Sequence, residues 1–155
     1  MVHGMPMTNE IRARIQGRLA KLYGEAEAET LTERVADVCR AHLSHIDGRP
    51  DPRTWDQQDA VLITYGGSIQ APGEKPLRTL KQFLDERLAG AVNMVHILPF
   101  FPYSSDDGFS VTDFRAVKAE LGGWQDIEAI AGDFDLAVDL VLNHCSRENL
   151  WFIDY

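Results

Sequence analysis

The 155-residue chain is 45% hydrophobic, which is enough apolar material to bury a domain-sized core. Its 15 Lys and Arg residues against 24 Asp and Glu residues give a net charge of -9, and the absence of a basic stripe argues against a nucleic-acid partner. No apolar run approaches the ~20 residues of a membrane helix, and Met1–Asn9 lacks the apolar core of a signal peptide. We therefore expect a cytoplasmic protein with no membrane partner.

The apolar spacing of the first part of the chain, from about Thr8 to Ile46, is that of two helices. A break is predicted at Tyr23–Gly24. Thr30 and Glu33 form the T-x-x-E pattern of a capping box, in which each side chain accepts a hydrogen bond from the other residue's backbone N–H. The second predicted helix therefore begins near Thr30.

The segment Asp47–Asp56 contains one glycine and two prolines, which predicts a loop or linker. Cys39 and Cys145 lie far apart without a CxxC spacing, so we expect two reduced thiols and neither a zinc site nor a disulfide framework. The predicted organisation is a helical extension with its linker over residues 1–57, followed by a domain over residues 58–155.

Three short runs of apolar, β-branched residues predict buried strands: Val61–Tyr65, Val92–Leu98 and Leu136–Leu142. Helical spacing lies between them. The apolar positions of the two intervening helices are Leu77, Leu80, Leu84 and Leu88 in the first, and Trp124, Ile127 and Ile130 in the second. The predicted order is strand, helix, strand, helix, strand.

The predicted strands show little polar alternation, which predicts burial on both faces and hence a parallel α/β sheet covered by helices. A doubly wound sheet and a barrel both fit this pattern. Tyr65–Ser68 does not continue as G-x-G-x-x-G into a helix, which disfavours a dinucleotide-binding fold.

Ligands of parallel α/β folds meet the loops that follow the carboxyl ends of the strands. The two glycines after Tyr65 would allow close approach of a ligand, or they form a plain tight turn. The loop Pro99–Phe114 mixes aromatic, acidic and hydroxyl side chains, a composition that suits sugars because rings pack on C–H faces and carboxylates accept hydrogen bonds from hydroxyls. Alternatively, Asp107–Gly108 is a turn and the aromatic residues cover the core.

The third predicted strand ends on polar side chains. Asp139 and Asn143 are four residues apart and are predicted to share one face of the strand, with His144 emerging at its end. A lone histidine in this position also fits a core role. A nucleophilic role for Cys145 is disfavoured, because adjacent residues of a strand face opposite ways.

These motifs resemble those of a known enzyme family. Asp139–His144 is similar to the D-x-x-x-N-H motif that ends the third barrel strand in the α-amylase superfamily, glycoside hydrolase family 13. Val95–Phe101 followed by Ser105–Phe109 resembles the branch that contains sucrose, sucrose 6-phosphate and glucosylglycerate phosphorylases, as does Leu62–Tyr65. The resemblance covers about Ala60–Tyr155 and implies the first three strands of a (β/α)8 TIM barrel with their helices, preceded by the helix pair.

The resemblance also implies roles for individual residues. Asp106 and His144 would bind hydroxyls of the transferred glucosyl unit, and Phe109 would form an apolar wall beside it. Asp139 and Asn143 would be structural. Because this branch generally lacks the calcium of many amylases, we expect no metal, and no cofactor is implied.

Enzymes of this family retain configuration by using a nucleophile and an acid/base, two carboxylates about 5 to 5.5 Å apart. The resemblance places them after the fourth and fifth barrel strands, so no catalytic residue is expected up to Tyr155, and a complete barrel needs about 250 residues. We therefore expect an inactive N-terminal fragment of a phosphorylase whose substrates are an α-glucoside and inorganic phosphate. Two alternatives remain: a fragment of a retaining α-glucosidase or amylase, and a non-catalytic sugar-binding module. The acceptor and the oligomeric state are not predicted.

Overall fold

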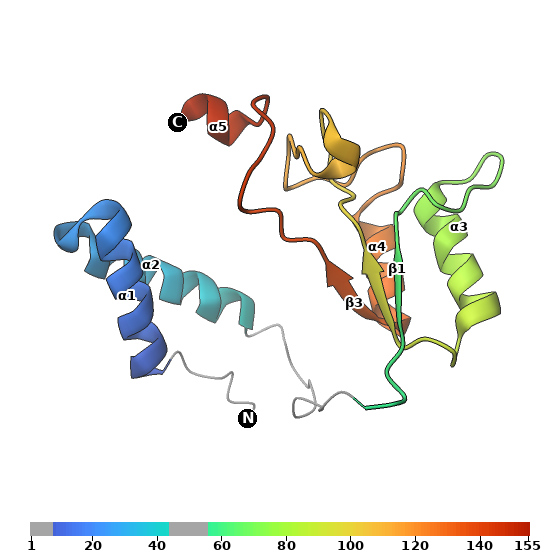
Figure 1. Cartoon of the computed structure of the whole chain (residues 1–155), viewed down its shortest axis with the longest axis horizontal. Coiled ribbons are helices and arrows are strands. Elements are labelled where there is room, and N and C mark those ends of the chain that lie inside the picture. The colour runs from blue at the N-terminus through green and yellow to red at the C-terminus, as the bar shows by residue number, and fades with distance from the viewer. Residues whose placement is uncertain (1–7, 44–55) are drawn as a thin grey trace. The chain divides into compact units, whose positions relative to one another are not determined.

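The computed structural model describes residues 8–43 and 56–155, and the chain divides into two compact units, Met1–Thr54 and Trp55–Tyr155. The first unit contains two helices and the second contains a parallel sheet with its helices (Figure 1). In chain order the elements are α1 (Asn9–Tyr23), α2 (Glu25–Leu43), β1 (Val61–Thr64), α3 (Pro76–Phe83), a π-helical turn (Leu84–Leu88), β2 (Met94–Ile97), a 3-10 turn (Asp106–Gly108), α4 (Trp124–Asp133), β3 (Asp135–Val138) and α5 (Leu150–Asp154). Within the described ranges, no helix is both long enough and apolar enough to cross a membrane.

The two helices of the first unit meet where the sequence predicts a break. Thr8 caps α1, because its hydroxyl oxygen accepts a hydrogen bond from the N–H of Ile11 at 3.2 Å. Gly24 ends α1 with a φ of 89°, a left-handed conformation that glycine adopts without strain, and α2 begins at the next residue. The predicted capping box at Thr30 is therefore wrong, since Thr30 lies inside α2.

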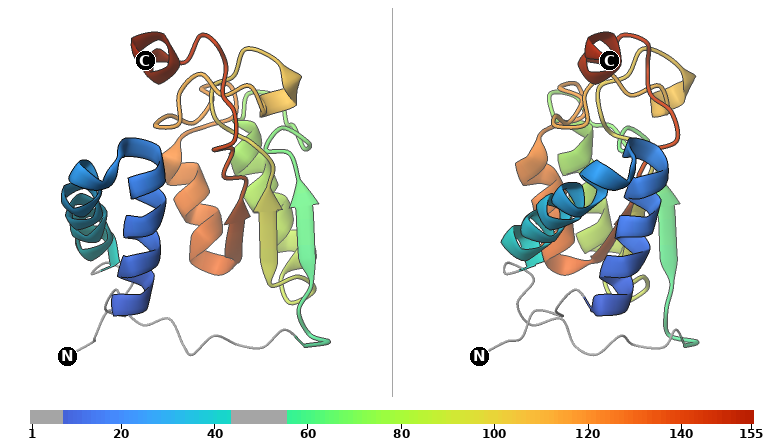
Figure 2. Two further views of the ribbon diagram at one scale, coloured as in Figure 1. Left: turned by 60° about the vertical axis from the view of Figure 1, so that its left-hand side comes forward. Right: turned by 90° about the vertical axis from the view of Figure 1, so that its left-hand side faces the viewer.

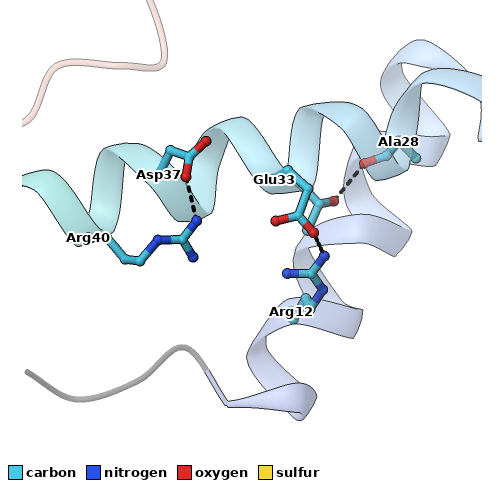
Figure 3. Close-up of polar contacts among 6 residues, drawn as sticks. Arg12, Ala28, Glu33, Asp37 and Arg40 are labelled. Atoms are coloured by element: carbon cyan, nitrogen blue, oxygen red, sulfur yellow. Dashed lines mark hydrogen bonds and ion pairs between the residues drawn. The ribbon is translucent and has the colours of Figure 1, made fainter.

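A stripe of small buried residues runs along α2, consisting of Ala28, Thr32 and Ala36. The hydroxyl of Thr32 donates a hydrogen bond to the carbonyl oxygen of Ala28 at 2.6 Å, so this buried hydroxyl has a hydrogen-bond partner. An ion pair between Arg12 of α1 and Glu33 of α2 joins the helices (Figure 3). Small residues on α2 allow α1 and α2 to approach each other closely.

The sheet of the second unit is parallel with the strands in sequence order, as predicted. In the sheet register, Ile97 of β2 pairs with Thr64 of β1 and with Val138 of β3. The third strand is shorter than predicted, because β2 offers no partner beyond Ile97 and the chain leaves the sheet at Asp139. Asp139 and Asn143 therefore do not share a strand face, and that prediction is wrong.

One face of the sheet is covered by α3 and α4 (Figure 2). Pro76 stands in the first turn of α3, where its missing N–H costs nothing. As predicted, the helices contribute Leu77, Leu80, Leu84, Ile127 and Ile130 to the core, whereas Trp124 is 42% exposed. Val95 and Ile97 of β2 complete this layer from the sheet.

Within the second unit, no helix covers the opposite face of the sheet. Alternate side chains of β1 point toward it, and Ile63 is 61% exposed. Leu140 and Leu142, which follow β3, are also exposed. The helices of the second unit thus bury one face of the sheet, and the other face presents apolar side chains.

Candidate functional site

The segment after β2 contains a tight left-handed turn. Asp106, Asp107 and Gly108 have φ angles of 59°, 47° and 110°. Aspartate tolerates this conformation better than most residues, whereas at Gly108 a Cβ would lie 2.7 Å from the carbonyl oxygen of Pro99. Gly108 is buried and Asp106 is exposed, so the turn packs onto the end of β2 while it presents the Asp106 carboxylate to solvent.

The aromatic residues of this segment divide into two groups. Phe100 and Phe101 lie in the core, with ring centroids 4.8 Å apart, which agrees with the alternative that these aromatics cover the core. Phe109 is only partly buried and packs against that core at the end of the turn, where its N–H donates to the carbonyl oxygen of Asp106 at 2.9 Å. The backbone of Phe109 is therefore tied to that of the exposed Asp106.

The segment after β3 carries the remaining predicted site residues. Asp139 pairs with His96 of β2, with 3.2 Å between His96 Nε2 and Asp139 Oδ2, and each side chain is 26% exposed. Asn143 and His144 are exposed. Sequence reasoning missed His96, because it sits within a predicted strand and only the register shows that it reaches Asp139.

Hydrogen bonds join these two segments. The hydroxyl oxygens of Ser104 and Ser146 are 2.7 Å apart, and the N–H of Ser146 donates to the carbonyl oxygen of Val111 at 3.0 Å. The Asn149 side-chain amide donates to the same carbonyl oxygen at 3.4 Å. The contacts bring together the segments that carry Asp106 and His144, at the end of the sheet where the parallel strands terminate.

Little in the sequence indicates that these residues link the two segments. Ser104 and Ser146 are small polar residues, each two positions from a predicted site residue, and Asn149 lies further along the chain. A second contact between the segments is aromatic: Phe114 stacks on Trp151 with centroids 5.7 Å apart, and the Arg115 guanidinium lies 5.2 Å from the centre of the Trp151 ring.

No protein-family model matches the chain. A glucosylglycerate phosphorylase from Allomeiothermus silvanus is 48% identical over 149 residues, which cover 94% of this chain and 25% of that protein. Another from Spirochaeta thermophila is 61% identical over 97 residues, 63% of this chain and 16% of the relative. The chain is a homologue of the glucosylglycerate and sucrose phosphorylases, a branch of glycoside hydrolase family 13. It spans about a quarter or less of the length of these two relatives.

The crystal structure of a sucrose 6F-phosphate phosphorylase from Thermoanaerobacter thermosaccharolyticum superposes with a TM-score of 0.57 at 36% identity. The match covers 65% of this chain and 20% of the other. The predicted fold class is therefore confirmed: the three-stranded parallel sheet and its helices form an α/β arrangement that matches part of a TIM-barrel enzyme of glycoside hydrolase family 13.

Proposed function

We propose that this chain supplies part of the glucosyl-binding site of a retaining phosphorylase, which transfers glucose from an α-glucoside to inorganic phosphate. The observation that carries the proposal is the hydrogen-bonded meeting of the segments after β2 and β3, which presents Asp106 and His144 at one end of the parallel sheet. Homology to phosphorylases favours this function over the hydrolase and the non-catalytic module.

Each proposed site residue has chemistry that suits a sugar ring. The Asp106 carboxylate accepts hydrogen bonds from hydroxyls, and such charge-assisted bonds are the stronger ones. A neutral His144 ring offers one donor and one acceptor. Phe109 supplies an apolar surface for ring C–H groups. We assign Asp139 and Asn143 a structural role at the end of β3, which for Asp139 rests on its contact with His96.

The proposed reaction proceeds by two displacements. A carboxylate attacks the anomeric carbon, the glucosyl ester forms, and the alcohol leaves with a proton from the acid/base. A phosphate oxygen then attacks the same carbon, displaces the carboxylate and yields glucose 1-phosphate. We assign both carboxylates to a part of the protein outside this chain. The residues of this chain bind and orient the sugar.

Because Cys39 and Cys145 are free thiols, we place the protein in the reducing cytoplasm.

The test is an assay of glucose 1-phosphate formed from sucrose and from glucosylglycerate with inorganic phosphate. It uses this chain and a version extended through the complete reading frame. We expect activity in the extended protein alone. Release of free glucose without glucose 1-phosphate would identify a hydrolase instead.

The assignment of Asp106 is tested in the extended protein with a matched pair of variants. Asp106→Asn is expected to lower kcat/KM by at least about tenfold, because charged hydrogen bonds to the sugar are lost. Asp107→Asn removes the same charge from the neighbouring left-handed position and should change kcat/KM less than about twofold. Equal effects of the two substitutions would contradict the role of Asp106.

A further inference from the structure

We propose that Ser104 and Ser146 are positioning residues that fix the distance between the two sugar-binding segments. This inference rests on the proposed function and names residues to which neither the family motifs nor the comparisons assign a role. Ser104 stands two residues before Asp106, and Ser146 stands two residues after His144. Their hydroxyl oxygens are 2.7 Å apart, so one short side-chain contact joins the two segments close to both site residues.

The environment of Ser146 makes this contact well defined. Ser146 is 4% exposed, its N–H donates to the carbonyl oxygen of Val111, and its hydroxyl oxygen also accepts the N–H of Glu148 at 3.0 Å. Asn149, 2% exposed, donates to that same Val111 carbonyl. The backbone of the segment after β3 is thus held in one register, and the Ser146 hydroxyl has a fixed position from which to meet Ser104.

The segment after β2 contains a second hydroxyl pair that provides a comparison. The Ser105 hydroxyl donates to the Ser110 hydroxyl oxygen at 3.0 Å, and both residues belong to the same turn. That pair lies within a single segment and stabilises the turn internally. The Ser104–Ser146 pair instead joins the turn to the segment of His144, so the two hydroxyl pairs separate turn stability from segment spacing.

The spacing matters because a sugar ring must satisfy Asp106 and His144 together. Binding groups held on two loops lose affinity when their separation varies, since a displacement of about 1 Å weakens several hydrogen bonds at once. The groups contact the sugar in the ground state as well as in the transition state. Loss of the link is therefore expected to raise KM for the glucoside more than it lowers kcat.

The experiment uses the extended protein with Ser104→Ala, Ser146→Ala and the double variant. Each single substitution is expected to raise KM for the glucoside about fivefold, with kcat and KM for phosphate within about twofold. The double variant should be no worse than Ser146→Ala, because Ser104→Ala removes no hydrogen bond that Ser146→Ala has not already removed. Ser104→Thr keeps a hydroxyl at this exposed position, so its KM for the glucoside should equal that of the unsubstituted protein. Ser110→Ala, which breaks only the internal pair, should leave KM unchanged.

The outcomes separate the inference from the proposed function. If the unsubstituted extended protein forms no glucose 1-phosphate, the proposed function fails and the positioning role fails with it. If it is active but the alanine variants keep their KM, or if the two effects add in the double variant, the positioning role alone is wrong. The alanine variants could instead show lower kcat and a lower melting temperature at unchanged KM, without rescue by threonine. That result would show that the serines have only a structural role, and it would also overturn the inference.

Discussion

At the scale of single residues, the left-handed turn depends on one glycine. Gly108 has a φ of 110°, and a Cβ there would approach the backbone oxygen of Pro99 to 2.7 Å. Gly108→Ala should lower the free energy of unfolding by about 2 kcal/mol, because strain and steric overlap fall on a buried backbone. Urea denaturation followed by tryptophan fluorescence measures the change.

Gly132 provides the matched control for this substitution. It lies in α4, in the same unit, and no atom lies within 4 Å of a Cβ built there. Gly132→Ala should leave stability unchanged or raise it by up to about 1 kcal/mol through helix propensity. Equal destabilisation by both substitutions would contradict the steric argument for Gly108.

Asp126 supplies a pH-dependent contribution at the start of α4. Burial by itself would raise the pKa of the Asp126 carboxyl, but hydrogen bonds from Arg78 and from the Gly123 N–H outweigh burial and leave the pKa below its ordinary value. The ionised form is therefore favoured in the folded state. The resulting stability is present above the unfolded-state pKa of about 4 and is lost as pH falls through the lower folded-state pKa.

Asp126→Asn should therefore lower the free energy of unfolding by about 1 kcal/mol at pH 7, chiefly through the weakened helix cap. The difference from the unsubstituted protein should shrink as pH falls below about 4. Urea midpoints across this pH range measure it. Glu128→Gln, which removes a charge from an exposed position of the same helix, is the control, and a pH-independent deficit in Asp126→Asn would refute the linkage.

Residue-level patterns predicted some of these features and missed others. The glycine that ends α1 was predictable, since Gly24 interrupts a helical run. The T-x-x-E pattern predicted the wrong start for the second helix, because the same residues also fit a helix interior and α2 begins earlier, at Glu25. The Ser104–Ser146 contact was beyond sequence reasoning, since it joins positions 42 residues apart through side chains common in any loop.

At the scale of elements, the sheet has one covered face and one open face. Ile97 is fully buried beneath the helices, whereas Ile63 is 61% exposed on the other face. Ile97→Thr should lower the free energy of unfolding by about 3 kcal/mol, because a methyl contact is lost and a hydroxyl is buried. Ile63→Thr keeps a β-branched residue in β1 and should change stability by less than about 0.5 kcal/mol.

Ile63→Thr also tests whether the exposed apolar face is a site of self-association. Ile63→Thr should reduce the association of the purified 155-residue chain, because exposed apolar sheet surface promotes contact between molecules. Light scattering at increasing concentration measures this effect. Unchanged association of the Ile63→Thr variant would show that the self-associating surface lies elsewhere in the chain.

The extent of each strand shows where the sequence stops being informative. The first strand ends close to its predicted boundary, because glycines follow the apolar run. The third apolar run continues to Leu142, but β3 ends at Val138 where its neighbour's register ends. Hydrophobicity indicates that a strand exists, and the length of the pairing partner sets its end.

At the scale of the whole molecule, the two compact units each have their own packing. A shortened chain that begins at Trp55 should retain the sheet and its helices, because the core of the second unit is formed by its own residues. Amide NMR spectra of the shortened chain and of the 155-residue chain should then overlay for most residues after 56. Loss of dispersed signals in the shortened chain would show that the second unit depends on the first.

The sequence order of the strands has a consequence for synthesis on the ribosome. Each strand pairs with the one translated just before it, and no later strand is inserted between two earlier ones. The sheet can therefore grow from β1 toward β3 as the polypeptide emerges, at roughly 5–20 residues per second. During the seconds between completion of β2 and arrival of β3, the free edge of β2 is the surface that a nascent-chain chaperone would need to shield.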